Sequence, residues 1–338
     1  MKNSILTEYT CTVPFEDINV MQGKDQYFCC KDWLDIDLSQ EQGFNNAWNS
    51  NIAKKIRESV LDGTFKYCNS TVCPHLNTVI KHGRPSGPVK LKTTVDKSTL
   101  SAEGPSNIKF TFDSACNLAC PTCRVDFIRN SPAIEKRTDE ILEDIYLSYG
   151  KYIKTIMLSG YGDPFYSTSF FKFLCNLDAE RMPMLEQIHL HTNAILWNER
   201  NWEKIAKAHP YIKSAEISID AATKQTYEIV RKGGNWELLM KNLQFINSLD
   251  NIQSLIFSFV LQKQNYSEIV DFYHLIKSTL PDKEVFFQYY SVQDWGVMNK
   301  ETYVNMKVWD KSHPEHEQFN IIVSKLMEIK DKNISISY

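Results

Sequence analysis

Residues 108–123 read IKFTFDSACNLACPTC and carry the clearest pattern in the chain. The first six residues alternate between apolar and polar side chains, which predicts a β-strand over 108–113. Three cysteines follow, Cys116, Cys120 and Cys123, with three and then two residues between them. With nine cysteines in 338 residues, chance gives this spacing about 0.006 times. A loop that carries three thiols directly after a strand predicts a metal centre at the end of that strand.

The composition is that of a folded protein, with 43% hydrophobic and 23% charged residues. The net charge of -3 argues against a wholly basic surface for nucleic acid or anionic lipid. The first 17 residues lack the pattern of a secretory signal, and no apolar run approaches the roughly 20 residues of a membrane helix. We therefore expect a cytoplasmic protein without nucleic-acid or membrane partners. In the cytoplasm thiols stay reduced, so clustered cysteines favour metal binding over disulfides.

Strand-like and helix-like segments alternate after a linker rich in glycine and proline at residues 83–105. This order predicts an α/β fold whose parallel strands are covered by helices, with a spacing that suits a curved or partly closed barrel. We expect a Cys-rich segment and linker over 1–100, the barrel over 101–300 and a helical extension over 301–338. The expected strands are 108–113, 155–159, 187–191, 214–220, 254–261 and 284–290. The expected helices are 137–149, 169–177, 198–208, 224–249 with a break at 233–234, and 267–279.

Three thiolates on one short loop suit either an iron–sulfur cluster or a zinc ion. Zinc prefers a fourth protein ligand, and no His or Cys follows within the loop. In a [4Fe–4S] cluster, three protein ligands leave one iron open to an outside ligand, which is a catalytic arrangement. A structural zinc site, or thiols without a common role, is the alternative.

The trio of Cys116, Cys120 and Cys123 after a first barrel strand resembles that of the radical S-adenosylmethionine (SAM) enzymes. The resemblance implies a partial (β/α)6 TIM-like barrel. It also implies a catalytic [4Fe–4S] cluster that binds SAM through its open iron and reduces it to a 5′-deoxyadenosyl radical. Thr122 departs from the pattern, because many members have an aromatic residue just before the third cysteine. The departure removes a packing contact to adenine but no cluster ligand.

Residues 158–164 look like the glycine-rich stretch whose backbone meets the methionyl amino group of SAM in this family. The resemblance assigns cofactor binding to Ser159, Gly160, Gly162 and Asp163. Glycine lets a backbone approach a ligand closely, and a carboxylate such as Asp163 can pair with an ammonium group. An ordinary turn is the alternative, because Gly-Asp-Pro is common in turns.

Period-two alternation over 214–220 places Glu216, Ser218 and Asp220 on one face of the expected strand. A polar stripe of this kind should face the barrel interior. By the resemblance, Ser218 contacts the ribose or carboxylate of SAM, and Arg231 meets its methionyl carboxylate. For Arg231 the alternative is a solvated helix end followed by a glycine cap. Further polar residues are candidates to line the cavity: His189 and His191 on one face of the third expected strand, and Gln288 and Tyr290 at the end of the sixth. For the two histidines, hydrogen-bonded positions within the barrel are the alternative.

A second group of cysteines lies in the N-terminal segment: Cys29, Cys30, Cys68 and Cys73. Three or four thiolates joined by a loop, a helix and a loop suit a second metal site, with structural zinc as the alternative. The segment resembles the SPASM or twitch extensions that carry auxiliary clusters, so we expect one auxiliary [4Fe–4S] cluster. Adjacent side chains diverge in an extended segment, so Cys29 and Cys30 need not bind together, and the choice between them is open. The two remaining cysteines are isolated in the sequence, Cys11 and Cys175.

The sequence thus favours an enzyme whose 5′-deoxyadenosyl radical abstracts hydrogen from an unactivated C–H bond. Oxidation and epimerisation both begin with this step. The expected substrate is a sugar or another small molecule, or else a peptide, and the expected electron donor is a protein such as flavodoxin or ferredoxin. The alternative from another class is a non-catalytic scaffold in which both cysteine groups hold zinc.

Overall fold

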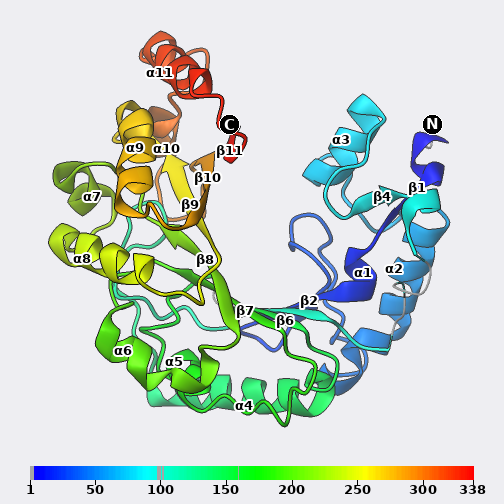
Figure 1. The fold of residues 1–338 in the computed structure, drawn as a ribbon. Coiled ribbons are helices and arrows are strands. Elements are labelled where there is room, and N and C mark those ends of the chain that lie inside the picture. Colours follow the sequence, from blue (N-terminus) through cyan, green and yellow to red (C-terminus); the bar gives the residue numbers. More distant parts are fainter. Residues whose placement is uncertain (1–3, 97–99, 101–102, 159) are drawn as a thin grey trace. The chain divides into compact units, whose positions relative to one another are not determined.

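The computed structural model describes residues 4–96, 100, 103–158 and 160–338 (Figure 1). They fall into two compact units, which we describe separately. The first comprises Met1–Asp113, Pro132–Gly160 and Asp178–Gln187. The second comprises Ser114–Ser131, Tyr161–Leu177 and Ile188–Tyr338.

The first unit holds a mainly parallel run of strands in the order β6-β5-β2-β3. Strands β2 and β5 are parallel, as are β5 and β6, whereas β3 returns antiparallel to β2. A separate antiparallel pair joins β1 and β4, with Cys11 opposite Val89. The strands are β1 (Tyr9–Cys11), β2 (Asp17–Met21), β3 (Gln26–Tyr27), β4 (Val89–Leu91), β5 (Asn107–Thr111) and β6 (Thr155–Leu158). The α-helices are α1 (Val13–Glu16), α2 (Asn51–Leu61), α3 (Pro74–His82) and α4 (Pro132–Tyr149).

The second unit holds five parallel strands in the order β11-β10-β9-β8-β7. The strands are β7 (Gln187–Thr192), β8 (Ile212–Ser218), β9 (Ser254–Leu261), β10 (Glu284–Ser291) and β11 (Ile334–Ser337). The α-helices are α5 (Thr168–Cys175), α6 (Glu199–Lys204), α7 (Lys224–Val230), α8 (Trp236–Asn247), α9 (Ile269–Thr279), α10 (Lys300–Met306) and α11 (His316–Glu328). Each strand from β7 to β10 is followed by helix, as the alternating pattern predicts.

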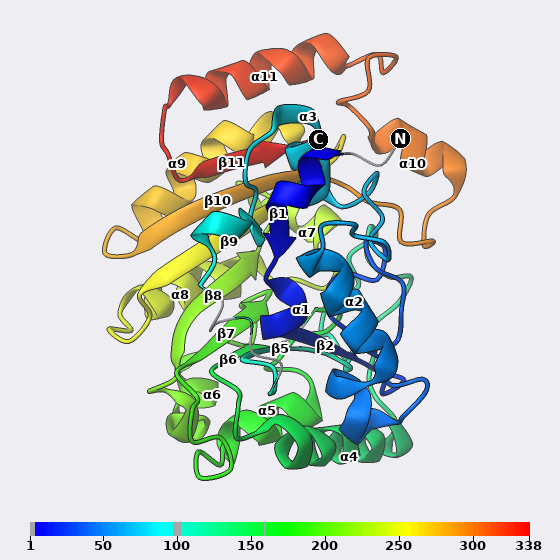
Figure 2. The same cartoon turned by 90° about the vertical axis from the view of Figure 1, so that its right-hand side faces the viewer.

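The helices of the second unit begin where their sequences supply a capping side chain. Asn198, Thr223 and Asn235 each accept a hydrogen bond from a backbone N–H in the first turn of α6, α7 and α8. Gly233, at φ +91°, makes the predicted break between α7 and α8. Helices α7, α8 and α9 lie on the same side of strands β8, β9 and β10 (Figures 1 and 2).

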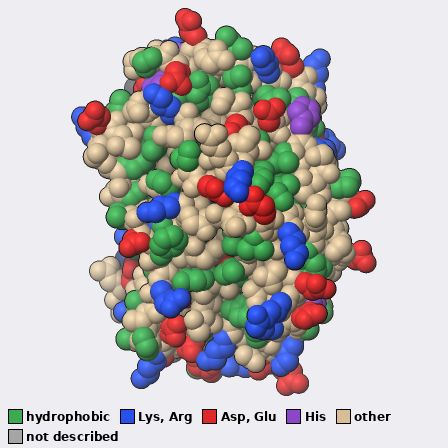
Figure 3. Space-filling view, turned by 90° about the vertical axis from the view of Figure 1, so that its left-hand side faces the viewer, with side chains coloured by type: hydrophobic (Ala, Val, Ile, Leu, Met, Phe, Trp, Pro, Cys, Tyr) green, Lys and Arg blue, Asp and Glu red, His purple; other side chains and the backbone are tan. Residues whose placement is uncertain are grey.

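The apolar faces of β9, β10 and α9 form an aromatic core in the second unit. Phe259 lies 5.0 Å from Phe272 and 5.6 Å from Tyr289, measured between ring centroids, and all three rings are buried. Removing such a side chain from water stabilises a fold by roughly 1.5–3 kcal/mol. On the outer face over α6 to α9, acidic and basic side chains are interspersed (Figure 3). Among the described residues, no helix has both the length and the apolar character needed to span a membrane.

These observations confirm the expected fold class, an α/β architecture built on mostly parallel strands. Nine strands form these two runs, four in the first unit and five in the second, and within the described residues neither run closes into a barrel. All six strands expected past the linker are present as β5 to β10. Strand β2 from the N-terminal segment and the C-terminal β11 extend the runs, which the sequence pattern did not reveal. The division at residues 100 and 300 stays a prediction.

Candidate cluster and cofactor site

The three predicted cluster ligands lie on one loop of the second unit. Cys116 and Cys120 are buried, whereas Cys123 is exposed. The backbone N–H groups of Cys123 and Arg124 both donate to the Cys120 carbonyl oxygen, at 2.9 and 3.1 Å, so a tight turn separates the last two cysteines. An isolated antiparallel β-bridge between the backbones of Cys116 and Ile128 closes the base of the loop. The trio is thus held on a compact, closed loop.

Two backbone hydrogen bonds attach this loop to other parts of the second unit. The Asp163 N–H donates to the Ala115 carbonyl at 2.9 Å, just before the first cysteine. The Ala119 N–H donates to the Lys232 carbonyl at 2.9 Å, just before the second. The segments around residues 163 and 231, which the sequence analysis singled out, therefore border the cysteine loop directly.

Each cysteine sulfur has a nitrogen donor nearby. The backbone N–H of Leu118 lies 3.4 Å from the Cys116 Sγ, and the Asn193 amide nitrogen lies 3.7 Å from it. Arg231 Nη1 lies 3.7 Å from the Cys120 Sγ, and Arg124 Nη2 lies 3.4 Å from the Cys123 Sγ. Hydrogen bonds and positive charge favour thiolates over thiols, so these donors suit a site that binds metal through sulfur.

Burial opposes ionisation of these thiols in the protein without metal. It raises the pKa of Cys116 to about 12 and also raises the pKa of Cys120. Metal binding requires the thiolate, so the bound metal must supply the charge that stabilises it. Among the described residues, no three His, Cys, Asp or Glu side chains are arranged to share a single metal ion. A cluster is wider than one ion, and its ligand sulfurs stand farther apart.

The carboxylate of Asp163 is used within the protein. It is 1% exposed and accepts hydrogen bonds from the Phe165 N–H at 3.0 Å, the Thr192 hydroxyl at 2.7 Å and the Asn193 N–H at 2.9 Å. These bonds join the turn after β6 to the end of β7. Burial raises the pKa of this carboxyl, and the hydrogen bonds act against that rise. The structure thus gives Asp163 a positioning role beside the cysteine loop, through Thr192 and Asn193.

We expect Asp163→Asn to lower the free energy of unfolding by about 3 kcal/mol, because an amide nitrogen would face buried donors that the carboxylate oxygen accepts. The measurement is chemical denaturation of the anaerobic protein. The matched control is Asp250→Asn, because Asp250 is an exposed carboxylate of the same unit. Equal stability of the two variants would show that the Asp163 bonds do not hold this turn.

Arg231 forms a buried ion pair rather than a solvated helix end. Its Nη2 lies 2.7 Å from the Asp220 Oδ2, and the two side chains are 12% and 3% exposed. Burial alone would lower the pKa of the Arg231 guanidinium, but Asp220 and the Cys120 thiol raise it, so Arg231 stays charged. Its Nε is buried without a hydrogen-bond partner in the described structure. The guanidinium is therefore a charged donor beside Cys120, and its Nε–H can still donate a hydrogen bond to an anionic group.

The polar stripe predicted on β8 is present and extends to its neighbours. Ser218 Oγ lies 2.8 Å from the Ser258 Oγ on β9 and 3.3 Å from the His191 Nε2 on β7. His191 Nε2 also lies 3.6 Å from the Glu216 carboxylate. Tyr290 on β10 belongs to the same set, and burial raises its pKa to about 12. The apolar alternates Ile217, on β8, and Ile219, just after it, are buried as the alternation requires.

Of the remaining residues expected to bind SAM, Gly160 and Gly162 follow β6. Ser159 falls outside the described residues. A Cβ on Gly160 would stand 2.7 Å from the Thr111 Cγ2, so this position requires glycine for packing within the first unit. Gly162 lies in the bend just before Asp163. The cofactor contacts of these residues stay predictions.

In the first unit, the structure groups the cysteines differently from the set expected from the sequence. Cys29, Cys68 and Cys73 line one pocket, and Cys11 lines it with them. Cys30 is exposed, and its Sγ lies 4.0 Å from the Asp32 carboxylate. Arg124 was not predicted from the sequence as a residue of the site. It contacts Cys123 and donates to the Ser114 carbonyl at 2.9 Å and to the Tyr161 carbonyl. Because Arg124 directly follows the third cysteine, its position in the sequence could have identified it.

No curated protein matches the chain. Among solved structures, TYW1 with a lysine-pyruvate adduct bound is 16% identical and matches over 63% of this chain and 70% of its own, with a TM-score of 0.38. Methylornithine synthase (PylB) is 13% identical and matches over 66% of this chain and 62% of its own, with a TM-score of 0.39. Both scores are low, and no property follows from these two likenesses.

The comparison with protein families is specific. Residues 112–276 match the model of the radical SAM superfamily. This range contains Cys116, Cys120 and Cys123 together with Asp163 and Arg231, whereas the N-terminal cysteines lie outside it. The chain therefore carries a domain of the radical SAM superfamily, which spans residues 112–276.

Proposed function

We propose that this protein cleaves SAM reductively at a [4Fe–4S] cluster held by Cys116, Cys120 and Cys123, and uses the product radical on a substrate C–H bond. When bound, the cluster supplies one electron to SAM, which yields methionine and a 5′-deoxyadenosyl radical able to take a hydrogen atom. The observation that carries this proposal is the cysteine loop itself. It lies in the matched domain, and each of its three sulfurs has a nitrogen donor within 3.7 Å.

The residues around the loop fit a cluster with one open iron. Three thiols supply three ligands, and thiolates are the usual protein ligands of iron–sulfur clusters. Arg124 and Arg231 place positive charge next to Cys123 and Cys120, where the cluster and its thiolates add negative charge. The unpartnered Nε of Arg231 suits a carboxylate, which supports the expected contact with the methionyl carboxylate of SAM.

The polar stripe supports a ligand that carries hydroxyl groups. Ser218, Ser258 and His191 form a connected set of hydroxyls and imidazole on adjacent strands, and Glu216 adds a carboxylate. Such groups can both donate to and accept from sugar hydroxyls. We place a sugar or another small molecule first among substrates and a peptide second, with oxidation or epimerisation as the outcome. The accompanying proposals are an auxiliary cluster in the N-terminal segment, a cytoplasmic location and an electron donor such as flavodoxin or ferredoxin.

The test uses anaerobically reconstituted protein with SAM and dithionite. We expect 5′-deoxyadenosine and methionine in equal amounts. Sugars and peptides deuterated at candidate C–H positions are then added in turn, and we expect a substrate of one class to pass deuterium into 5′-deoxyadenosine. Protein that binds zinc instead of iron and forms no 5′-deoxyadenosine would contradict the proposal and indicate a non-catalytic scaffold.

A further inference from the structure

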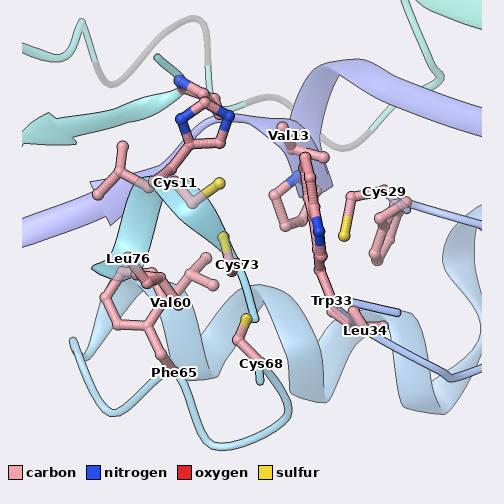
Figure 4. A pocket seen from close by; sticks show the side chains of 15 residues that line it. Cys11, Val13, Cys29, Trp33, Leu34, Val60, Phe65, Cys68, Cys73 and Leu76 are labelled. Carbon is pink, nitrogen blue, oxygen red and sulfur yellow. The ribbon is translucent and has the colours of Figure 1, made fainter. Parts of the chain in front are cut away.

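Four cysteines of the first unit line one pocket, although the first and the last are 62 positions apart in the sequence. They are Cys11, Cys29, Cys68 and Cys73, and the space among the pocket walls is about 480 Å³, including its open mouth (Figure 4). The other lining residues are mostly apolar, among them Val60, Phe65 and Leu76. An apolar pocket with four thiols as its main ligand groups is typical of a sulfur-ligated metal centre.

Local structure brings each thiol to this place. Cys11 ends β1, whose pairing with β4 sets it opposite Val89, another lining residue. Cys68 and Cys73 flank a turn in which the Cys73 N–H donates to the Asn69 carbonyl at 2.9 Å. The Asn69 N–H in turn donates to the Trp33 carbonyl at 2.8 Å, which ties this turn to the segment after Cys29. The four thiols thus come from three separate segments, of which the second and third are joined by the bond between Asn69 and Trp33, while β1 is joined to β4.

Cys30 does not belong to this group. It is exposed and does not line the pocket, and its Sγ lies 4.0 Å from the Asp32 carboxylate. Cys29 and Cys30 follow β3, and only Cys29 lines the pocket. Of the two adjacent cysteines, the structure therefore selects Cys29.

A buried cation lies against the wall of the pocket. Arg57 on α2 is 5% exposed and donates from Nε to the Pro14 carbonyl at 2.7 Å. Its guanidinium lies 5.0 Å from the centroid of Phe28 and 4.5 Å from that of Trp48. Pro14 and Phe28 both line the pocket. Within the described residues, neither Nη of Arg57 has a hydrogen-bond partner.

An unpaired buried cation is unfavourable unless an anion lies close by. A [4Fe–4S] cluster with four thiolate ligands carries net negative charge, so the position of Arg57 suits such a centre. A single zinc ion fits less well. Zinc needs four ligands about 2.3 Å from one point, and no such grouping of three or more occurs among the described residues. In Figure 4 the ring of Trp33 stands between Cys29 and the other three cysteines, so any centre that uses all four thiols requires this ring to move aside.

We propose that Cys11, Cys29, Cys68 and Cys73 are the four ligands of the auxiliary [4Fe–4S] cluster, and that Cys30 is not a ligand. This inference rests on the part of the proposed function that places a second cluster in the N-terminal segment. Four protein ligands leave no iron open, so this cluster cannot bind a substrate atom or SAM directly. The two cysteine groups thus define two different kinds of centre, one open and one closed.

The test starts from a variant with Cys116, Cys120 and Cys123 replaced by alanine, in which remaining iron belongs to the second centre. After anaerobic reconstitution we expect about four irons and four sulfides per chain. Adding Cys11→Ser should lower the iron content and change the EPR signal of the reduced cluster, whereas the matched change Cys30→Ser should leave both unchanged. In the starting variant, the EPR signal of the reduced cluster should be unaffected by SAM. Circular dichroism and size exclusion verify that each variant is folded.

Three results would overturn the inference: an unchanged iron content and EPR signal in the Cys11→Ser variant, a change in either of them in the Cys30→Ser variant, or zinc bound in place of iron. If Cys11→Ser prevents folding, Cys11→Ala and Cys68→Ser provide the same comparison at the same site. Failure of the proposed function is a separate result. It would appear as absence of 5′-deoxyadenosine from the wild-type protein, whatever the iron count of the N-terminal variants.

Discussion

Replacing Cys116, Cys120 and Cys123 together by alanine should abolish 5′-deoxyadenosine formation and lower the iron content from about eight to about four per chain. The three sulfurs lie on one loop and are the thiols of the matched domain that have Arg124, Arg231 and Asn193 as donors. Without them, no iron is held where SAM is expected to bind. The measurement pairs chemical iron and sulfide analysis with chromatography of the reaction products.

Cys175→Ala is the matched control for this variant. Cys175 belongs to the same unit and ends α5 as a partly buried free thiol. It should keep about eight irons and form 5′-deoxyadenosine at the wild-type rate. If the triple variant still produced 5′-deoxyadenosine, the assignment of the cleavage site to this loop would be wrong.

Asp220→Asn should lower the free energy of unfolding by about 3–5 kcal/mol, because it leaves the buried Arg231 cation without its partner. The substitution isolates the charge. Asparagine tolerates the left-handed backbone of this position, at φ +64°, and its carbonyl oxygen can still accept from the Val260 N–H. What is lost is the 2.7 Å contact to the Arg231 Nη2. Chemical denaturation of the anaerobic protein measures the change.

The double variant Asp220→Asn with Arg231→Met tests this reasoning. Removing both charges should recover part of the stability that the single change loses, because no unpaired charge stays buried. The same double variant should bind SAM more weakly, since Arg231 supplies the cation beside Cys120. If the Asp220→Asn variant is as stable as the wild-type protein, the ion pair contributes little to stability, and the stabilising role assigned to it is wrong.

Local sequence signals predicted the barrel strands and the cysteine loop. Alternation and helix periodicity are properties of short segments, so β5 to β10 and the helices between β7 and β10 were found near their observed bounds. The spacing of Cys116, Cys120 and Cys123 is likewise local.

Contacts between distant segments could not be predicted in this way. Cys11 stood apart in sequence, and only the pairing of β1 with β4, some 80 residues later, places it beside Cys29, Cys68 and Cys73. The roles of Asp163 and Asp220 depend on burial and on partners in other elements, Thr192 and Arg231. Strand β11 is short and half-exposed, and its parallel pairing with β10 is again a distant contact.

The central claim is that the loop at residues 116–123 holds a cluster with an open iron that binds SAM. EPR of the reconstituted, dithionite-reduced protein before and after addition of SAM tests it most directly. We predict that SAM changes the signal of one of two clusters, and that this responsive signal is missing from the variant without Cys116, Cys120 and Cys123. Fully iron-loaded protein whose spectrum does not respond to SAM would contradict the claim.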